Sequence, residues 1–177
     1  RQGEPACIED LLARERDIVR IVAPGTIEGG DVLRIGRTLF VGLSTRSNHE
    51  GHQQLAALVR PHGYTVVPVR VTGSLHLKTA CTALDADTLL LNPAWLDSGA
   101  FAGFMTLEVH ADEPFAANVL PVGATLIANA AFPRTFECVE AHARSAGRAV
   151  FAVEIQEFGK AEAGLTCMSL IFMGGRA

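Results

Sequence analysis

The sequence predicts an α/β protein in which modules of two strands, a helix and a third strand repeat around one axis. Strand-like apolar runs alternate with helical patterns along the chain. Polar residues recur in front of such runs, at Glu28, His76, Asn118 and Cys167, which are 48, 42 and 49 residues apart. Such periods are typical of radial or stacked modules, because each unit is too small to bury its own apolar face. A carboxylate, an imidazole, an amide and a thiol are therefore expected to converge at the axis.

The composition favours a single globular domain that spans residues 1–177. Of the 177 residues, 49% are hydrophobic, which is enough for a core, and no linker or low-complexity tract divides the chain. The net charge of -4 gives no electrostatic footprint for nucleic acid or an anionic membrane. No apolar run is long enough to span a bilayer. Neither nucleic acid nor a membrane is therefore expected as a partner.

The metal-ligating residue types are too scattered to predict a metal centre. The four cysteines, Cys7, Cys81, Cys138 and Cys167, show neither metal-ligand spacing nor a dense disulfide pattern. His49 and His52 lie three residues apart on a predicted helix but lack a third ligand nearby. We expect no metal and no organic cofactor, and a reducing cytoplasmic compartment is the simplest interpretation of the cysteine pattern.

The first module is preceded by a partial one. Residues 1–16 have the apolar spacing of an amphipathic helix, and residues 18–22 have the composition of a strand. The runs 32–35 and 38–43 are separated only by Gly36 and Arg37, which predicts a β-hairpin.

A helix and a closing strand are predicted to complete the first full module, which begins with this hairpin. Ser47 and Glu50 match the Ser-x-x-Glu capping box, so we expect a helix to begin there and to end near Gly63. Residues 64–71 are rich in β-forming types and predict the returning strand.

Two further modules follow the same order. The second contains a strand at 88–91 and a weakly marked helix near 96–104. The third contains a strand at 126–128, a helix at about 136–145 ended by Gly147, and a closing strand at 149–153. Residues 156–163 then predict a polar loop that leads to Cys167.

Cys167 is the candidate nucleophile. An apolar run at 170–173 follows it, which predicts a thiol at the mouth of a buried strand. A free cysteine is often only a packing residue, Glu28 could be a solvated turn acid, and His76 could be a hydrogen-bonded core histidine. The shared spacing of these residues favours a common site over three separate structural roles.

Six segments resemble one known family. They are Glu28-Gly29-Gly30-Asp31, the stretch from Val41 to Asn48, Leu75-His76-Leu77-Lys78-Thr79, Ala116-Ala117-Asn118, Pro133-Arg134-Thr135 and Leu165-Thr166-Cys167. They cover nearly the whole chain, in the order in which the dimethylarginine dimethylaminohydrolases carry them. These enzymes belong to the guanidine-modifying superfamily and share the five-bladed α/β-propeller called the pentein fold.

The resemblance implies a fold and an extent. The chain would contain about three to three and a half of the five pseudo-symmetric ββαβ modules. The family's upstream Phe-x-Glu-Asp segment, whose acids contact the guanidinium group, and its lid loop have no counterpart in the sequence. We therefore expect the chain to be the carboxy-terminal part of a longer protein.

The resemblance also implies the site. Glu28, His76 and Cys167 match the family's catalytic glutamate, histidine and cysteine, and Arg46 matches the arginine that binds the substrate α-carboxylate. Hydrolysis of a guanidinium group needs a soft nucleophile, a proton for the departing amine, and carboxylates to hold the planar group. Cys167 thiolate would attack, His76 would transfer protons, and Glu28 would orient His76 or bind guanidinium nitrogens.

Lys78 helps to choose within the superfamily. Arginine deiminases and amidinotransferases usually carry His-x-Asp, in which the aspartate grips the terminal guanidinium nitrogens. This chain has Lys78 at that position, as the dimethylarginine hydrolases do. A site without that carboxylate would leave room for N-methyl groups, although Lys78 could also be a plain strand-end charge.

The sequence thus predicts a cysteine hydrolase that converts Nω-methylated arginine to citrulline and methylamine or dimethylamine. An arginine deiminase, another guanidine hydrolase or an amidinotransferase is the alternative enzyme. A non-catalytic pentein that acts as a binding module is the alternative outside enzymes. The expected partner is a small-molecule substrate, and a homodimer is compatible with the sequence.

Overall fold

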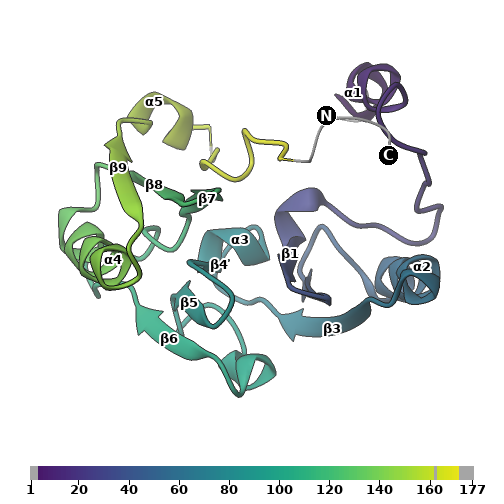
Figure 1. The fold of residues 1–177 in the computed structure, drawn as a ribbon. Helices are drawn as coiled ribbons and strands as arrows, with labels where there is room; N and C mark the ends of the chain where they lie inside the picture. Colours follow the sequence, from purple (N-terminus) through teal and green to yellow (C-terminus); the bar gives the residue numbers. More distant parts are fainter. Residues whose placement is uncertain (1–3, 162, 172–177) are drawn as a thin grey trace.

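The computed structural model describes residues 4–161 and 163–171. In this part of the chain, the strands form three separate three-stranded sheets that follow one another around an arc (Figure 1). The first strands, β1, β4 and β7, lie toward the inside of the arc, and β3, β6 and β9 lie at its rim.

Each sheet repeats one topology. Its first two strands form an antiparallel hairpin, and its third strand pairs in parallel with the second after a helical crossover. The strands are β1 (Val32–Ile35), β2 (Thr38–Leu43) and β3 (Thr65–Arg70); β4 (Cys81–Ala83), β5 (Thr88–Leu91) and β6 (Met105–Glu108); and β7 (Leu120–Val122), β8 (Thr125–Asn129) and β9 (Ala149–Val153). The crossovers are α2 (His49–Val59), the 3-10 helix η3 (Ser98–Phe101) and α4 (Pro133–Ser145). The predicted ββαβ modules are confirmed.

Glycines close two of the hairpins. Gly36 between β1 and β2 has φ of 56°, and Gly123 between β7 and β8 has φ of 57°. Two-residue hairpin turns require such left-handed backbone, which a residue without Cβ adopts at no steric cost. The hairpin predicted around Gly36 therefore forms with the predicted strand limits.

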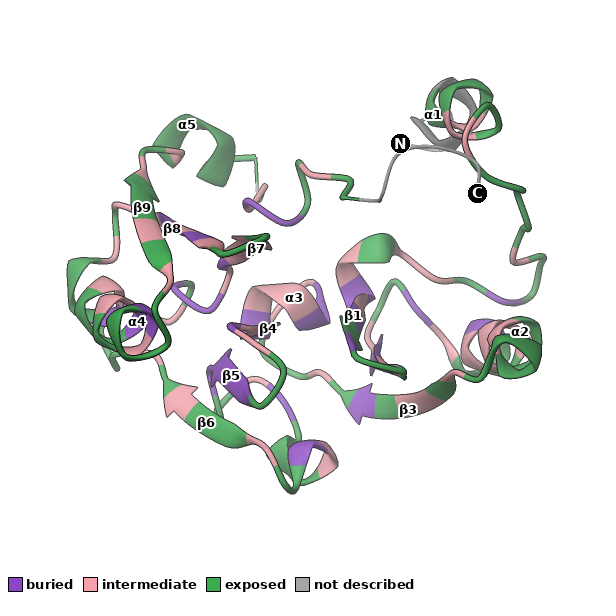
Figure 2. Cartoon of the chain, in the orientation of Figure 1, coloured by how far each residue is buried: buried purple, intermediate pink, exposed green. Residues whose placement is uncertain are grey.

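The core lies between neighbouring sheets, with β5 at its centre. All four β5 residues are buried, because successive side chains of a strand point to opposite faces and both faces are covered (Figure 2). Leu89 and Leu91 belong to the apolar cluster shared with the first sheet, and Leu90 belongs to the cluster shared with the third. Each buried leucine contributes about 1.5–3 kcal/mol to stability.

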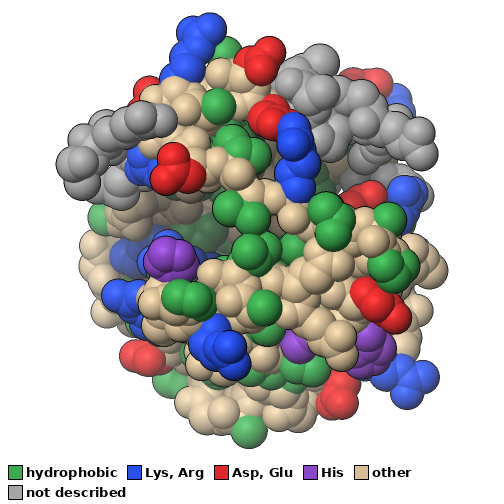
Figure 3. Space-filling view, turned by 90° about the vertical axis from the view of Figure 1, so that its right-hand side faces the viewer, with side chains coloured by type: hydrophobic (Ala, Val, Ile, Leu, Met, Phe, Trp, Pro, Cys, Tyr) green, Lys and Arg blue, Asp and Glu red, His purple; other side chains and the backbone are tan. Residues whose placement is uncertain are grey.

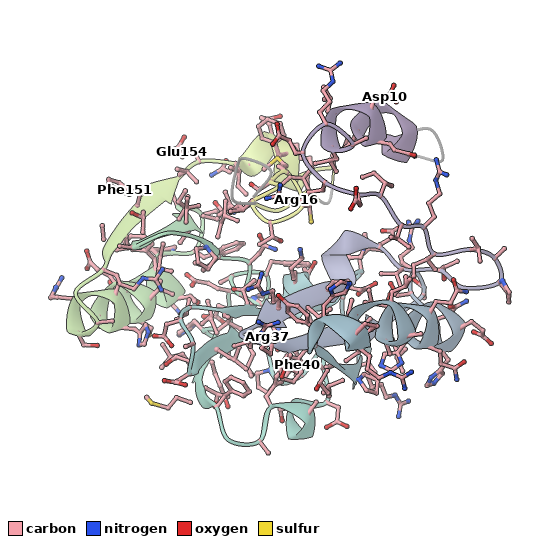
Figure 4. The ribbon with its side chains drawn as sticks, turned by 45° about the vertical axis from the view of Figure 1, so that its right-hand side comes forward. Asp10, Arg16, Arg37, Phe40, Phe151 and Glu154 are labelled. Carbon is pink, nitrogen blue, oxygen red and sulfur yellow. The ribbon has the colours of Figure 1, made fainter. Side chains whose placement is uncertain are left out.

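Aromatic rings fill the space between the first two sheets. Phe40 lies in the interior, as Figure 4 shows, with its ring centroid 4.8 Å from that of Phe101 and 5.8 Å from that of Phe104. Phe151 on the rim strand β9 is 60% exposed. The aromatic packing therefore joins the first and second sheets, whereas the Phe151 side chain lies outside the core.

The segment before the first sheet differs from the prediction. The first helix, α1, spans Glu4–Leu12, so the predicted helix 1–16 ends earlier than expected, and its residues 1–3 lie outside the described residues. Residues 18–22 form no strand. Instead, the Gln54 side chain accepts the Val22 N–H at 2.9 Å and donates to the Val22 carbonyl at 2.8 Å. A side-chain amide therefore satisfies the backbone groups that a neighbouring strand would otherwise pair.

Three other local predictions were wrong. Asn48, not Ser47, caps α2 by accepting the Gly51 N–H, because Ser47 is buried in another network. The second module has only η3 where a longer helix was expected near 96–104. The polar loop predicted at 156–163 begins with the short helix α5 (Gln156–Gly159).

The strand predicted near the end of the chain was also wrong, as far as the described residues test it. Leu170 and Ile171 are 64% and 58% exposed and form no strand. The rest of the predicted apolar strand, 172–173, lies outside the described residues. No helix in the described part of the chain is long and apolar enough to cross a bilayer.

Candidate active site

Glu28 and His76 meet at the inner edge of the first two sheets. Glu28 directly precedes the 3-10 helix η1 (Gly29–Asp31), and His76 directly precedes the short helix α3 (Leu77–Ala80). His76 is 6% exposed, and its Nε2 lies 2.5 Å from Glu28 Oε2. The carboxylate therefore fixes the orientation of the imidazole and favours its protonated form.

Gly30 makes room for the imidazole. A Cβ at this position would lie 2.6 Å from His76 Cγ and 2.9 Å from both Cδ2 and Nδ1. No side chain can occupy that space unless the ring moves. The Glu-Gly-Gly-Asp segment thus supplies both the carboxylate and the empty space beside the ring.

Cys167 reaches the same imidazole from the other end of the chain. It lies in an exposed turn in which its N–H donates to the Gly164 carbonyl at 3.1 Å. A hydrogen bond between the thiol and His76 is the main cause that lowers the pKa of Cys167, to about 7, and burial opposes it. The same bond raises the pKa of His76, burial lowers it, and Glu28 and Asp31 raise it further. The pair therefore favours a thiolate beside an imidazolium near neutral pH.

Arg46 lies close to this group. Its Nη1 is 3.5 Å from Glu28 Oε1, while the other Glu28 oxygen faces His76. The Arg46 side chain is 47% exposed, so part of the guanidinium surface is open to a ligand. The structure therefore brings all four predicted site residues, Glu28, Arg46, His76 and Cys167, into one neighbourhood.

A buried carboxylate that the sequence analysis missed supports three of them. Asp31 is fully buried and accepts the Leu77 N–H at 2.8 Å, the Ser44 hydroxyl at 2.8 Å and the Ser47 hydroxyl at 2.7 Å. Ser47 Oγ in turn accepts the Glu28 N–H at 3.0 Å. Because these partners are 13, 16 and 46 residues away in sequence, no local pattern identifies the network.

The Asp31 network also holds the loop that carries Arg46. Ser44 Oγ accepts the Arg46 N–H at 3.0 Å, and a Cβ at Gly42 would lie 2.6 Å from Asp31 Oδ1. One buried acid therefore ties the Arg46 loop to the segments that carry Glu28 and His76.

Lys78 lies on α3, two residues after His76. Burial lowers the pKa of its ammonium group, and the negative charges of Cys167 and Asp31 partly offset that effect. Its charge is therefore close enough to the thiolate to stabilise it.

A cavity of about 620 Å³ borders the loops that carry the imidazole and the thiol. Its lining includes Ser74 and Leu75 just before His76, and Ala163 and Gly164 just before Cys167. This volume suits a small molecule of amino-acid size. Figure 3 shows one face of the protein, on which acidic and basic side chains are interspersed and a hollow lies left of the centre.

The fold and this site define a pentein-type α/β-propeller of the guanidine-modifying superfamily. The sequence model of the arginine deiminase family matches residues 8–128. The chain is 36% identical over 174 residues to the N(G),N(G)-dimethylarginine dimethylaminohydrolase of Pseudomonas aeruginosa, covering 97% of this chain and 67% of that protein. It is 38% identical over 172 residues to the enzyme of the same name from Streptomyces coelicolor, covering 96% and 64%.

A solved structure agrees with the sequence comparisons. The dimethylarginine dimethylaminohydrolase of Pseudomonas aeruginosa, complexed with citrulline, superposes with a TM-score of 0.87 at 34% identity, over 97% of this chain and 67% of that one. The chain belongs to the dimethylarginine dimethylaminohydrolase family, and it spans about two thirds of the length of these relatives. The predicted family and fold class are confirmed.

Proposed function

We propose that this protein hydrolyses Nω-methylated L-arginine to L-citrulline and methylamine or dimethylamine. The observation that carries the proposal is that one buried imidazole, His76, is hydrogen-bonded to the Glu28 carboxylate and lies close enough to the Cys167 thiol to lower its pKa. The names of the relatives, and the citrulline in one of their structures, support the choice of reaction.

In the first step, Cys167 thiolate attacks the central carbon of the substrate guanidinium group. The new C–S bond forms as the electron pair of the attacking sulfur is shared with carbon. The bond from carbon to the methylated nitrogen then breaks, and that nitrogen keeps the bonding pair and takes a proton from the His76 imidazolium. Amine leaves, and a covalent thiouronium intermediate is attached to Cys167.

In the second step, water replaces the thiol. Neutral His76 takes one proton from the water, and the resulting oxygen nucleophile attacks the thiouronium carbon. The C–S bond breaks with its electron pair returning to sulfur, and the remaining proton of the former water passes to solvent as the ureido C=O forms. Citrulline leaves, and the thiolate and the imidazolium are restored.

The other two residues hold groups in place. Glu28 Oε2, 2.5 Å from His76 Nε2, orients the imidazole and stabilises its protonated form through both steps. Arg46 offers an exposed guanidinium group that would bind the substrate α-carboxylate, the planar pairing that arginine makes best.

Lys78 is the basis for preferring methylated substrates. An ammonium group near the thiolate cannot grip guanidinium nitrogens as a carboxylate at this position would. Unmethylated arginine would therefore leave donors unsatisfied, whereas a dimethylated nitrogen has none to satisfy. The expected preference for methylated substrates distinguishes the proposed reaction from that of an arginine deiminase.

Citrulline release tests the function. The purified protein is offered asymmetric dimethylarginine, monomethylarginine and arginine in parallel, with Cys167→Ser as the inactive variant and Cys138→Ser as the matched control. Cys138 is an exposed thiol on α4 that takes no part in the site. We expect release from the methylated substrates, abolished only by Cys167→Ser. Equal or better turnover of arginine contradicts the substrate choice, and no release from any substrate contradicts the function.

Compartment and assembly state remain predictions. The free thiols of Cys81, Cys138 and Cys167 support a reducing compartment, which we propose to be the cytoplasm, because oxidation of the nucleophile would stop the reaction. A homodimer is the proposed assembly. Cell fractionation and light scattering measure the two properties, and an oxidising compartment or a monomer would contradict them.

A further inference from the structure

The Asn118 side chain joins the two segments that carry the thiol and the imidazole. It lies two residues before β7, and its Nδ2 donates to the Lys78 carbonyl at 2.7 Å and to Thr166 Oγ1 at 2.8 Å. Its Oδ1 accepts the Thr166 N–H at 3.1 Å. Thr166 is adjacent to Cys167 in sequence, and Lys78 is two residues after His76.

We propose that Asn118 is a positioning residue that holds the Cys167 turn against the His76 segment. The inference rests on the proposed function only in that Cys167 is taken as the nucleophile. Among the described residues, Asn118 supplies the only backbone or side-chain hydrogen bonds that reach residues 164–166 from another element. Apart from the contact between thiol and imidazole, the remaining hydrogen bonds of 164–169 stay within that segment.

The chemistry of the three bonds requires an amide. Two N–H groups serve two acceptors, and the amide oxygen serves one backbone donor. A carboxylate has no donor for the Lys78 carbonyl, and leucine fills a similar volume without any donor or acceptor. Removal of the amide therefore leaves the thiol as the remaining hydrogen-bonded connection between the turn and the His76 segment among the described residues.

Gly164 shows that the amide fits closely into the turn. A Cβ at this position would lie 2.7 Å from Asn118 Oδ1 and 2.8 Å from its Cγ. Alanine at position 164 would therefore push the amide away from Thr166. The same glycine accepts the Cys167 N–H through its carbonyl, so the turn and the amide meet at one residue.

The position of the turn can be measured through the thiol. The pKa of Cys167 is lowered chiefly by its hydrogen bond to His76, so it rises when the turn moves away. The charged groups that act on the thiol are His76 and Lys78, and substitution of Asn118 changes neither. The Thr166 hydroxyl also lowers the thiol pKa through a hydrogen bond. A shifted thiol pKa therefore reports a changed geometry of the turn rather than a removed charge.

The first experiment compares Asn118→Leu with Asn92→Leu. Asn92 is a matched control, because it is a buried amide that donates to the Pro114 carbonyl and accepts the Ala94 N–H outside the site. Iodoacetamide alkylation of Cys167, followed by peptide mass across pH, gives the thiol pKa. In Asn118→Leu we expect the pKa to rise by about one unit and alkylation at pH 7 to slow several-fold. Citrulline release should lose kcat with little change in KM.

A double-mutant cycle keeps the test decisive if one variant folds poorly. Gly164→Ala alone should raise the thiol pKa, because its methyl group displaces the amide. In an Asn118→Ala background the same change should have little further effect, since no amide remains to be displaced. Additive effects of Gly164→Ala and Asn118→Ala would overturn the proposed contact.

The outcomes separate this inference from the proposed function. A normal Cys167 pKa in Asn118→Leu, with a loss of thermal stability equal to that of Asn92→Leu, overturns the positioning role. A raised thiol pKa supports it whether or not the wild-type protein hydrolyses methylated arginine. Failure of the wild-type protein to release citrulline contradicts only the reaction, because the titration involves no substrate.

Discussion

At the scale of single residues, the site depends on one imidazole that contacts two partners of opposite function. Glu28 faces the ring with a carboxylate, and Cys167 faces it with a thiol. The carboxylate keeps the ring protonated, and the protonated ring keeps the thiol ionised. The two titrations therefore belong to the pair rather than to either group alone.

The pH dependence of kcat/KM follows from this pair. Below about pH 7 the Cys167 thiol is protonated and a poor nucleophile, so the rate rises with pH through the lowered pKa of Cys167. Above the raised pKa of His76 the imidazole is neutral and cannot protonate the leaving amine, so the rate falls. A stopped assay of citrulline across pH 5 to 10 is expected to show a bell-shaped profile. A rate that climbs steadily to pH 9, as for an ordinary thiol, would contradict the ion pair.

The glycines beside His76 give a test with a built-in control. Gly30→Ala places a methyl group against the imidazole and displaces it from Glu28, so we expect kcat to fall about 100-fold. Gly29→Ala has no heavy atom within 4 Å of its Cβ position and should leave kcat within about twofold. Comparable losses in both variants would mean that η1 (Gly29–Asp31) tolerates no side chain for reasons unrelated to His76.

At the scale of elements, the sequence predicted those parts that local chemistry determines. The β1 and β2 hairpin formed because Gly36 permits its turn, and α4 ended where Gly147 takes φ of 64°. The site residues Glu28, His76 and Cys167 were predicted because they lie in front of strand-like runs at a repeating spacing and in segments that resemble the family.

Elements that depend on distant partners were not predictable from local pattern. Ser47 looked like a helix cap, but its hydroxyl donates to Asp31, so Asn48 caps α2 instead. Residues 18–22 have strand composition, but no strand in the described part of the chain pairs with them, and the side chain of Gln54 satisfies the backbone groups of Val22. Asp31 belongs to a segment that resembles the family, but its network gave no local signal, since its three partners come from other segments.

The Asp31 network is expected to act on the site as a unit. In Asp31→Asn one carboxylate oxygen becomes an NH2 group. Either the Ser44 and Ser47 hydroxyls, which both donate to Oδ2, or the Leu77 N–H, which donates to Oδ1, then loses its acceptor. We expect kcat/KM for methylated arginine to fall at least about tenfold, with the free energy of unfolding lowered by about 1–3 kcal/mol. Asp97→Asn, at an exposed cap of η3, is the control and should change neither. An active Asp31→Asn enzyme would show that the network is only structural.

At the scale of the whole molecule, the same contacts between sheets stabilise the fold and align the residues of the site. β5 is buried on both faces, so it joins the first sheet, which carries Glu28 near its first strand, to the third, which precedes Cys167. Loosening these contacts would therefore weaken the fold and the alignment of the site together.

Leu90 provides the corresponding stability prediction. It is fully buried among residues of the third sheet, so Leu90→Ala should lower the free energy of unfolding by about 2–5 kcal/mol through lost burial and the cavity left behind. Met105→Ala is the control, because Met105 is 64% exposed and should cost less than about 0.5 kcal/mol. Urea unfolding followed by circular dichroism measures both. A Leu90 variant as stable as wild type would contradict the described core.

The central claim is that Cys167 forms a covalent bond to the substrate carbon and that the methylated nitrogen leaves from this adduct before water attacks. Acid quenching during turnover, followed by mass measurement of the peptide that contains Cys167, tests it most directly. Asymmetric dimethylarginine and monomethylarginine should give adducts of the same mass, because each loses its methylated amine before the quench. An adduct that retains the methyl groups, or citrulline formation without any Cys167 adduct in single turnover, would contradict the mechanism.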